Sequence, residues 1–165
     1  MLLNKGVNVS FTVVEIKDEQ GLRRCFPAFK ELRPKLEKEA FVKQVQRQYQ
    51  QGYCVVAIEE LEEETHSTEA SYPSVLGFRF IENLAWGKII YIDDLATISG
   101  HRGQGFAPAL LDWIIELAQN QHCDAVHLDS GYARNAAHKV YLNKGFILSS
   151  HHFSCDLRSQ AKALV

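Results

Sequence analysis

The sequence lacks long apolar runs and has little imbalance of charge. No stretch approaches the ~20 apolar residues that a helix needs to cross a bilayer. The N-terminus also lacks the charged segment followed by a long apolar segment that marks a signal peptide. The 18 basic and 20 acidic residues give a formal net charge of −2, so bulk charge does not favour a nucleic-acid partner. These absences predict a cytoplasmic protein with neither a nucleic-acid nor a membrane partner.

The four cysteines lack the spacing of a redox motif or a metal site. Cys25, Cys54, Cys123 and Cys155 are scattered along the chain without a CxxC pair, and reduced thiols are the favoured interpretation. The seven histidines add no H-x-E, HExxH or Cys/His pattern. The sequence therefore predicts that no metal is bound.

The chain has enough apolar residues to build one core. Its 165 residues, 46% of them hydrophobic, predict a single domain over residues 1–165 with a weakly ordered tail at 158–165. An antiparallel meander followed by a crossover predicts a mixed α/β (α+β) fold. We expect about seven mostly antiparallel strands with helices on both faces of the sheet. The predicted strands are 7–16, 53–58, 75–81, 88–98, 125–130, 146–149 and 153–157. The predicted helices are 21–32, 36–51, 107–118 and 134–143, and a mobile loop is predicted at 61–74.

A glycine-containing turn joins the predicted strand 88–98 to the helix that follows. Gly103 and Gly105 stand where strand becomes helix, which exposes backbone N–H groups at a helix N-terminus. Pro108 fits the first helical turn but carries no N–H, so the donors should come from residues 103–107. Pro108 also replaces the third glycine of GxGxxG, and no Gly-Lys-Ser/Thr triplet of a P-loop occurs. The turn predicts a phosphate or pyrophosphate site, where Arg102 could add a charged contact or simply be solvated.

The same turn matches a known signature. Arg102-Gly103-Gln104-Gly105-Phe106-Ala107 fills the pattern Q/R-x-x-G-x-G/A, and its setting between a strand and an amphipathic helix resembles that of the GCN5-related N-acetyltransferase (GNAT) superfamily. The predicted element order is similar to that fold along nearly the whole chain. The resemblance implies an acyl-CoA N-acyltransferase (GNAT) fold and an acetyl-CoA-dependent N-acetyltransferase. It also implies acetyl-CoA as co-substrate, held at the turn by the six residues just quoted. Dimers are frequent in the family, which leaves a homodimer open.

The resemblance extends to the cofactor arm. In the family, the strand before the turn splays from its parallel neighbour and hydrogen-bonds the pantetheine amides like an added strand. This implies main-chain contacts from Leu95, Ala96 and Thr97, with 126–130 as the neighbouring strand. One backbone amide there would stabilise the carbonyl oxygen of the tetrahedral state. Asn135 is expected both to cap its helix and to contact the CoA arm, and a capping role alone fits it equally well.

Two adjacent acids precede these contacts. The stretch Tyr91-Ile92-Asp93-Asp94-Leu95 resembles the tyrosine, aliphatic and acidic pair of polyamine-type acetyltransferases, which implies Asp93 as base and Asp94 as amine-binding residue. Strand alternation places the two on opposite faces. The alternative is that either aspartate caps a bulge or pairs with an arginine. The base thus stays open between Asp93, Asp94 and a water chain.

The last predicted helix carries an acid candidate. The run 135–146 resembles the family's N-x-x-A-x-x-x-Y-x-x-x-G-F ending, with a departure, because His138 follows two alanines. The resemblance implies that Tyr141 protonates the departing thiolate; the alternative is a core aromatic beside Phe146. In the first helix–loop–helix, Phe29 and Arg33 are candidates for substrate choice, and ordinary core and surface roles fit them equally well.

Together these features predict an enzyme that moves the acetyl group of acetyl-CoA to a primary amine. The amine, on a small molecule or a peptide, would attack directly in a ternary complex, because no cysteine sits in the motifs. Two alternatives remain: a non-catalytic regulatory module that binds acetyl-CoA, and an enzyme that uses a longer acyl-CoA donor. The sequence does not name the acceptor.

Overall fold

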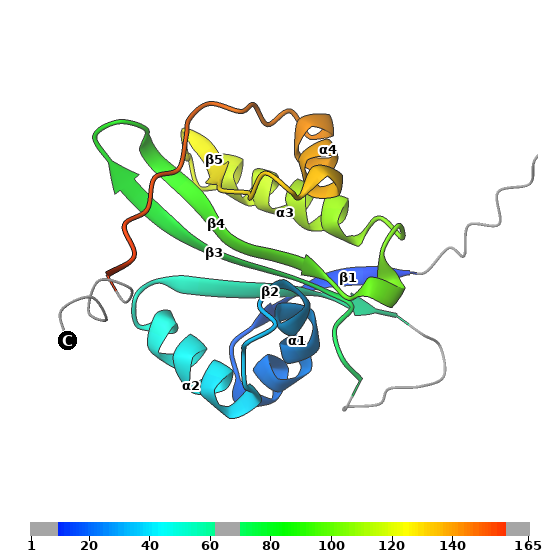
Figure 1. Ribbon diagram of the computed structural model, residues 1–165. Coiled ribbons are helices and arrows are strands. Elements are labelled where there is room, and N and C mark those ends of the chain that lie inside the picture. The colour runs from blue at the N-terminus through cyan, green and yellow to red at the C-terminus, as the bar shows by residue number, and fades with distance from the viewer. Residues whose placement is uncertain (1–9, 62–69, 158–165) are drawn as a thin grey trace, which may run out of the picture. The chain divides into compact units, whose positions relative to one another are not determined.

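The computed structural model describes residues 10–61 and 70–157 (Figure 1). Its internal contacts divide the chain into two compact units, of which unit 1 ends at Leu128 and unit 2 begins at Asp129. Three predicted features fall at least partly outside the described residues. They are the start of the first strand (7–9), the centre of the mobile loop (62–69) and the tail (158–165).

Unit 1 is built on a five-stranded sheet with the order β1-β2-β3-β4-β5. β1 to β4 form an antiparallel meander, and β5 pairs parallel to β4. The mixed, mostly antiparallel sheet is therefore confirmed. The strands are β1 (Phe11–Ile16), β2 (Tyr53–Glu60), β3 (Ser74–Asn83), β4 (Gly87–Thr97) and β5 (Ala125–Leu128).

The expectation of about seven strands was too high. In the described part of the chain, the segments 146–149 and 153–157 form no strand. Most of their large apolar side chains are exposed, Leu148 and Phe153 each to 89%. Alternating apolar residues indicate that a segment can form a strand, but a strand also needs a neighbouring backbone to pair with. The sequence pattern alone could not supply that second condition.

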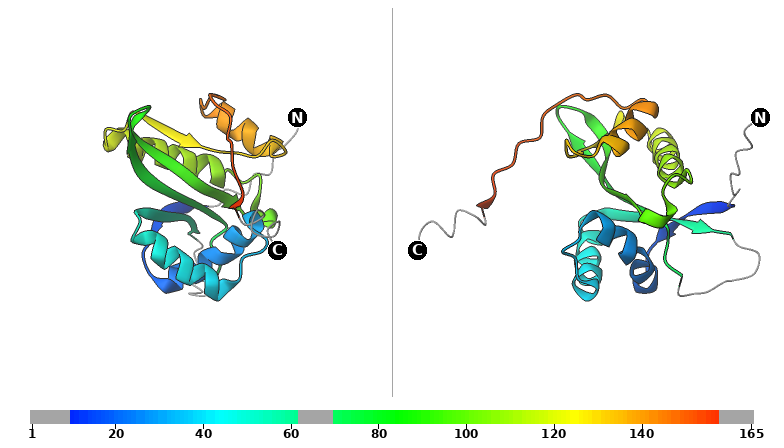
Figure 2. Two further views of the ribbon diagram at one scale, coloured as in Figure 1. Left: turned by 60° about the vertical axis from the view of Figure 1, so that its left-hand side comes forward. Right: turned by 45° about the vertical axis from the view of Figure 1, so that its right-hand side comes forward.

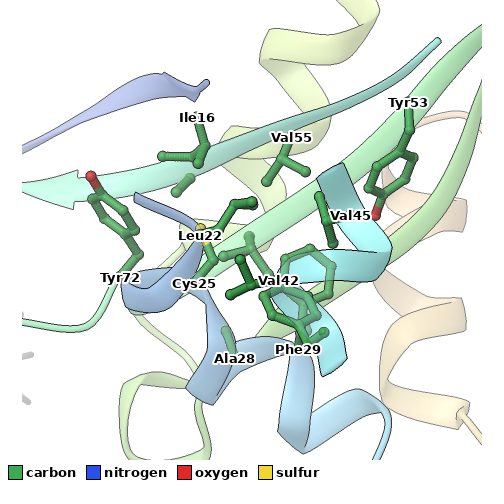
Figure 3. Close-up of a cluster of buried hydrophobic side chains, with 14 residues drawn as sticks. Ile16, Leu22, Cys25, Ala28, Phe29, Val42, Val45, Tyr53, Val55 and Tyr72 are labelled. Carbon is green, nitrogen blue, oxygen red and sulfur yellow. The ribbon is translucent and has the colours of Figure 1, made fainter. Parts of the chain in front are cut away.

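Helices cover both faces of the sheet, as predicted (Figure 2). α1 (Glu19–Leu32) and α2 (Lys38–Tyr49) lie against one face, and α3 (Phe106–Asn120) lies against the other. The Asp18 side chain caps α1 by accepting a hydrogen bond from Gly21 N at 2.7 Å. Leu22, Cys25 and Phe29 of α1 are among the side chains that close the core with β2 (Figure 3).

α3 shows the amphipathic spacing that the sequence predicts. Its buried residues lie three or four positions apart along one face, and its exposed residues are Asp112, Glu116, Gln119 and Asn120. Trp113 of α3 meets Phe78 of β3 edge to face, with ring centroids 6.1 Å apart. The buried residues are Phe106, Leu110, Leu111, Ile114 and Ala118. This second layer of core holds the start of α3, and thus the glycine turn, against the sheet.

Unit 2 contains the helix α4 (Asn135–Asn143). Arg134, not Asn135, is the N-cap residue, and no side chain caps this helix, so the predicted capping role of Asn135 was wrong. Gly145, with φ of +85°, follows the last turn in the left-handed region. The Tyr141 and Phe146 rings lie 6.0 Å apart, and the His138 ring is 3.1 Å from the Ser130 hydroxyl.

Candidate functional site

The glycine turn forms the surface at the start of α3. Gly103 and Gly105 have φ of +80° and +88°, in the left-handed region that favours glycine. Gly105 is also the N-cap residue of α3. A Cβ at either glycine would meet no atom within 4 Å. The space above the backbone at these two glycines is therefore open.

The backbone amides of this turn have no hydrogen-bond acceptor in the part of the chain that the structure describes. Within the described ranges, no N–H from Gly103 to Ala107 donates to a protein acceptor, whereas Ala109 N already bonds Gly105 O at 3.0 Å. The Phe106 side chain is 1% exposed and packs edge to face on Phe11, with centroids 5.2 Å apart. A buried anchor thus holds a row of unpaired donors at a helix N-terminus, which is an arrangement that binds anions.

Arg102 makes two hydrogen bonds to the protein although its side chain is 63% exposed. Its Nε donates to Thr97 O at 3.3 Å and its Nη2 lies 3.2 Å from Glu31 Oε2. The other oxygen of Glu31 accepts from Ser99 N and Ser99 Oγ at 3.3 and 3.0 Å. The Ser99 hydrogen bonds, helped by Arg102, lower the pKa of the Glu31 carboxyl. Glu31 therefore ties the end of α1 to the turn and orients the Arg102 guanidinium.

The strand before the turn has one open edge. β5 pairs with β4 from Ile89 to Ile92 only, although β4 continues to Thr97. Leu95, Ala96 and Thr97 are bonded to β3 on one side and, in the part of the chain that is described, face no strand on the other. The predicted neighbouring strand, 126–130, is shorter in the structure and ends at Leu128. The splayed edge can accept an extended chain as an additional strand.

A β-bulge in β4 at Asp93 and Asp94 interrupts the regular alternation of side chains between the two faces of the sheet. Asp94 pairs with Gly77 and Ile92 pairs with Phe78, which leaves Asp93 as the additional residue of β4. Arg79 Nε donates to Asp93 Oδ2 at 2.7 Å. Burial raises the pKa of the Asp93 carboxyl, and the hydrogen bond from Arg79 opposes that rise. The alternative to a catalytic role was that an aspartate lies at a bulge or pairs with an arginine, and Asp93 does both.

Asp94 accepts hydrogen bonds on both carboxylate oxygens. Arg33 donates to Oδ1 from Nη2 at 2.9 Å and from Nε at 3.3 Å, and the Tyr53 hydroxyl donates to Oδ2 at 2.9 Å. The Arg79 guanidinium lies over the Tyr53 ring, 5.3 Å from its centroid. Asp93 and Asp94 therefore belong to one connected network, and the prediction that they lie on opposite faces was wrong because the bulge interrupts the alternation.

Tyr53 and Arg79 were missed from the sequence. They are paired residues on neighbouring antiparallel strands, β2 and β3, and no local motif marks either one. Tyr53 is 3% exposed. Burial, and then the charge of Asp94, raise the pKa of its phenol well above the usual value, so Tyr53 stays a hydrogen-bond donor at any ordinary pH. Only the strand register could have identified these two residues.

Gly77 leaves room for the Tyr53 ring. A Cβ at Gly77 would overlap the Tyr53 hydroxyl, so we expect Gly77→Ala to lower the free energy of unfolding by about 1–3 kcal/mol through overpacking. Denaturant titration measures this loss. Gly100→Ala is the matched control, because a Cβ there meets nothing within 4 Å. Equal stability of the two variants would show that Tyr53 can move away without cost.

The remaining predicted residues are placed as follows. Phe29 is 2% exposed and its ring packs on Phe41, with centroids 5.1 Å apart, so its side chain serves the core. Tyr141 and Asn135 belong to unit 2. Burial raises the pKa of the Tyr141 phenol, and the charge of Arg134 acts against that rise. Asn135 is exposed at the first position of α4.

The described residues 10–61 and 70–157 contain neither a metal-binding cluster nor a membrane-spanning helix. No three His, Cys, Asp or Glu side chains in those ranges lie close enough together to hold a metal ion. None of the helices there combines the length and the apolar character needed to cross a membrane.

Comparisons with known proteins give one family, a relative along most of the chain and several structures with the same fold. The model of the acetyltransferase (GNAT) family matches residues 20–146. The uncharacterized N-acetyltransferase YhdJ of Bacillus subtilis is 28% identical over 141 residues, which are 84% of this chain and 94% of that protein. A Trypanosoma brucei acetyltransferase superposes with a TM-score of 0.71 at 17% identity, over 90% of this chain and 100% of the other. An aminoglycoside N-acetyltransferase in complex with CoA superposes with a TM-score of 0.72 at 12% identity, over 95% and 99%.

Proposed function

Because the chain belongs to the GNAT acetyltransferase family, we propose that it moves the acetyl group of acetyl-CoA to a primary amine by direct attack in a ternary complex. The observation that carries the proposal is the row of unpaired amides from Gly103 to Ala107 next to the open edge of β4. An anion site and a strand-accepting edge side by side suit the diphosphate and the amide-containing arm of one ligand. CoA is the ligand in one structural neighbour.

The donor would be held mainly by backbone groups. The amides at the start of α3 bind the diphosphate, and the open edge of β4 binds the pantetheine amides. A backbone N–H of β4 stabilises the oxyanion as the carbonyl becomes tetrahedral. Asn135 adds a contact to the CoA arm. The residues proposed for the turn and the edge are Arg102, Gly103, Gln104, Gly105, Phe106 and Ala107, then Leu95, Ala96 and Thr97.

Asp93 is the proposed base. A primary amine with a pKa near ~10.4 is mostly protonated at neutral pH and must lose a proton before it attacks. Asp93 Oδ2 is bonded to Arg79, but Oδ1 has no donor among the described residues and can accept from an ammonium group. Burial raises the pKa of Asp93, which makes its carboxylate a better proton acceptor. The Asp94–Arg33 pair forms the substrate-binding side of the same network.

The proposed reaction has two stages, which are the attack of the free amine and the departure of the CoA thiolate. The ammonium passes one proton to the Asp93 carboxylate and on to water, and the free amine attacks the thioester carbonyl. The C–N bond forms first and gives the tetrahedral oxyanion. The C–S bond breaks as the oxyanion collapses, and the nitrogen passes its second proton to the Asp93 carboxylate and on to water. The departing sulfur takes a proton from the Tyr141 hydroxyl, which is later restored from solvent. The products are the amide and CoA thiol.

A panel of amines tests the proposed function. We expect the protein to release CoA thiol from acetyl-CoA only when an acceptor amine is present, and a thiol-detecting assay over the panel measures this. Tight binding of acetyl-CoA without release for any amine would instead identify a regulatory module. Faster release from a longer acyl-CoA would identify a different donor.

Tyr141→Phe should lower turnover while leaving the affinity for acetyl-CoA nearly unchanged. The phenol donates its proton only as the thiolate leaves, so its loss raises the barrier without removing a binding contact. Steady-state rates and calorimetry measure the two quantities. Tyr132→Phe is the matched control, because Tyr132 is 83% exposed. An unaltered rate of Tyr141→Phe, with chemistry shown to limit turnover, would remove the acid role.

A further inference from the structure

We propose that Arg33 binds an anionic group of the acceptor, so that the preferred acceptors are amines that carry a carboxylate or a phosphate close to the amino group. This inference rests on the proposed function, since it assigns the substrate class of the same site. It follows from the unused edge of the Arg33 guanidinium, from the rigid support behind it, and from the balance of charge around Asp93 and Asp94.

The Arg33 guanidinium has N–H groups that no described residue accepts. Both of its hydrogen bonds, from Nε and Nη2, end on one atom, Asp94 Oδ1. A guanidinium carries five N–H groups, and within residues 10–61 and 70–157 none of the others has an acceptor. The side chain is 55% exposed. The edge between Nη1 and Nη2 can therefore bind a carboxylate or phosphate through two parallel hydrogen bonds.

Asp94, the carboxylate partner of Arg33, is fixed in position by its burial and by a second hydrogen bond. The Asp94 side chain is 16% exposed, and its second oxygen accepts from the buried Tyr53 hydroxyl at 2.9 Å. Tyr53 in turn fits over Gly77, where any side chain would displace it. With both oxygens occupied, Asp94 orients Arg33 and leaves the acceptor ammonium to Asp93 Oδ1. The guanidinium is thus an oriented binding group rather than a mobile surface charge.

The charges of the network add up to zero. Asp93 is paired with Arg79 and Asp94 with Arg33, two carboxylates against two guanidiniums. A polyamine brings only positive charge into this neutral network, so its extra ammonium groups lie near Arg33 with no negative group left to balance them. An amine with a nearby anion places its ammonium on Asp93 and its anion on Arg33, so that both charges are matched. Complementary charge of this kind selects between ligands.

Matched acceptors measure the preference directly. The pairs are an α-amino acid against its amide, and O-phosphoethanolamine against ethanolamine, with putrescine as the polyamine. We expect kcat/KM to be higher for the anion-bearing member of at least one pair than for its partner and for putrescine. The pair that shows the larger ratio distinguishes a carboxylate from a phosphate.

Arg33→Gln should remove that preference. We expect kcat/KM for the favoured anion-bearing amine to fall about 10–100-fold, mostly through KM, because a charge-assisted pair of hydrogen bonds is lost. The uncharged partner should change little, and the Kd for acetyl-CoA should stay the same. Arg33→Lys, which keeps the charge but not the fork, should fall between the two. Lys35→Gln removes an equal charge two residues away and should leave all the ratios intact.

Several results would overturn the inference. One is a wild-type preference for putrescine. Another is an Arg33→Gln variant that slows both members of each pair equally, and a third is a loss of acetyl-CoA affinity in that variant, which would place Arg33 at the donor. If wild-type protein releases no CoA with any amine, the proposed function itself fails and this inference fails with it.

Discussion

Gly105→Glu is expected to abolish the binding of acetyl-CoA. Gly105 has φ of +88° and is the N-cap residue of α3, in the middle of the row of unpaired amides. A glutamate there adds bulk and a negative charge at the point where the diphosphate is proposed to sit. It also favours a backbone conformation that would turn the amides away. Titration calorimetry with acetyl-CoA measures the loss.

Two control variants separate the causes. Gly52→Glu introduces the same side chain at φ of +79°, in a position with nothing within 4 Å, after α2 and at the other end of β2 from the turn. It should retain full affinity for acetyl-CoA. Gly105→Ala adds the conformational strain with little bulk and no charge, and should weaken binding only in part. Unchanged affinity of Gly105→Glu would reject the turn as the diphosphate site.

Asp93→Asn should lower kcat/KM for acetyl transfer by about 10²–10⁴-fold, the usual contribution of a positioned general base. The amide keeps an oxygen for Arg79 but cannot take a proton from the ammonium. The pH dependence gives a second test. Burial raises the pKa of Asp93, and the base acts only when deprotonated, so kcat/KM of the wild type should fall as the pH drops through that pKa. The variant should lack this acidic limb.

Glu82→Gln is the matched control for this experiment. Glu82 lies on the neighbouring strand β3 with an exposed side chain, and the same change of carboxylate to amide there should leave both the rate and its pH profile intact. If Asp93→Asn kept the acidic limb, the base would have to be Asp94 or a chain of waters. A denaturation curve for each variant shows whether the Arg79 pair still supports the fold.

The turn and its helix could be predicted because their signals are local. Positive φ at Gly103 and Gly105 follows from residue type and from the junction of strand and helix. The buried positions of α3 follow from apolar spacing along one segment. Both signals lie within about twenty consecutive residues, so no distant partner was needed to interpret them.

The contacts that join Asp94 to Arg33 and Tyr53 could not be predicted in the same way. Arg33 and Asp94 are 61 positions apart, and Tyr53 and Asp94 are 41 apart; only the packing of α1 and the register of β2, β3 and β4 bring them together. A single bulge moved Asp93 out of the expected alternation and into the network of Asp94. The prediction of strands at 146–149 and 153–157 was wrong for a related reason. A strand must pair with a neighbouring backbone, and the residues of the strand itself do not specify that neighbour.

The chain's local chemistry was thus enough to predict the order of the elements from β1 to α4, the amphipathic α3 and the glycine turn before it. The tertiary fold alone decided which charged groups lie together. It paired Asp93 with Arg79, and it placed Asp94 next to Arg33 and Tyr53. It also left room for the Tyr53 ring only because residue 77 is a glycine. The reason is physical. Backbone conformation depends on neighbours along the chain, whereas ion pairs and close packing depend on neighbours in space, which sheet register determines.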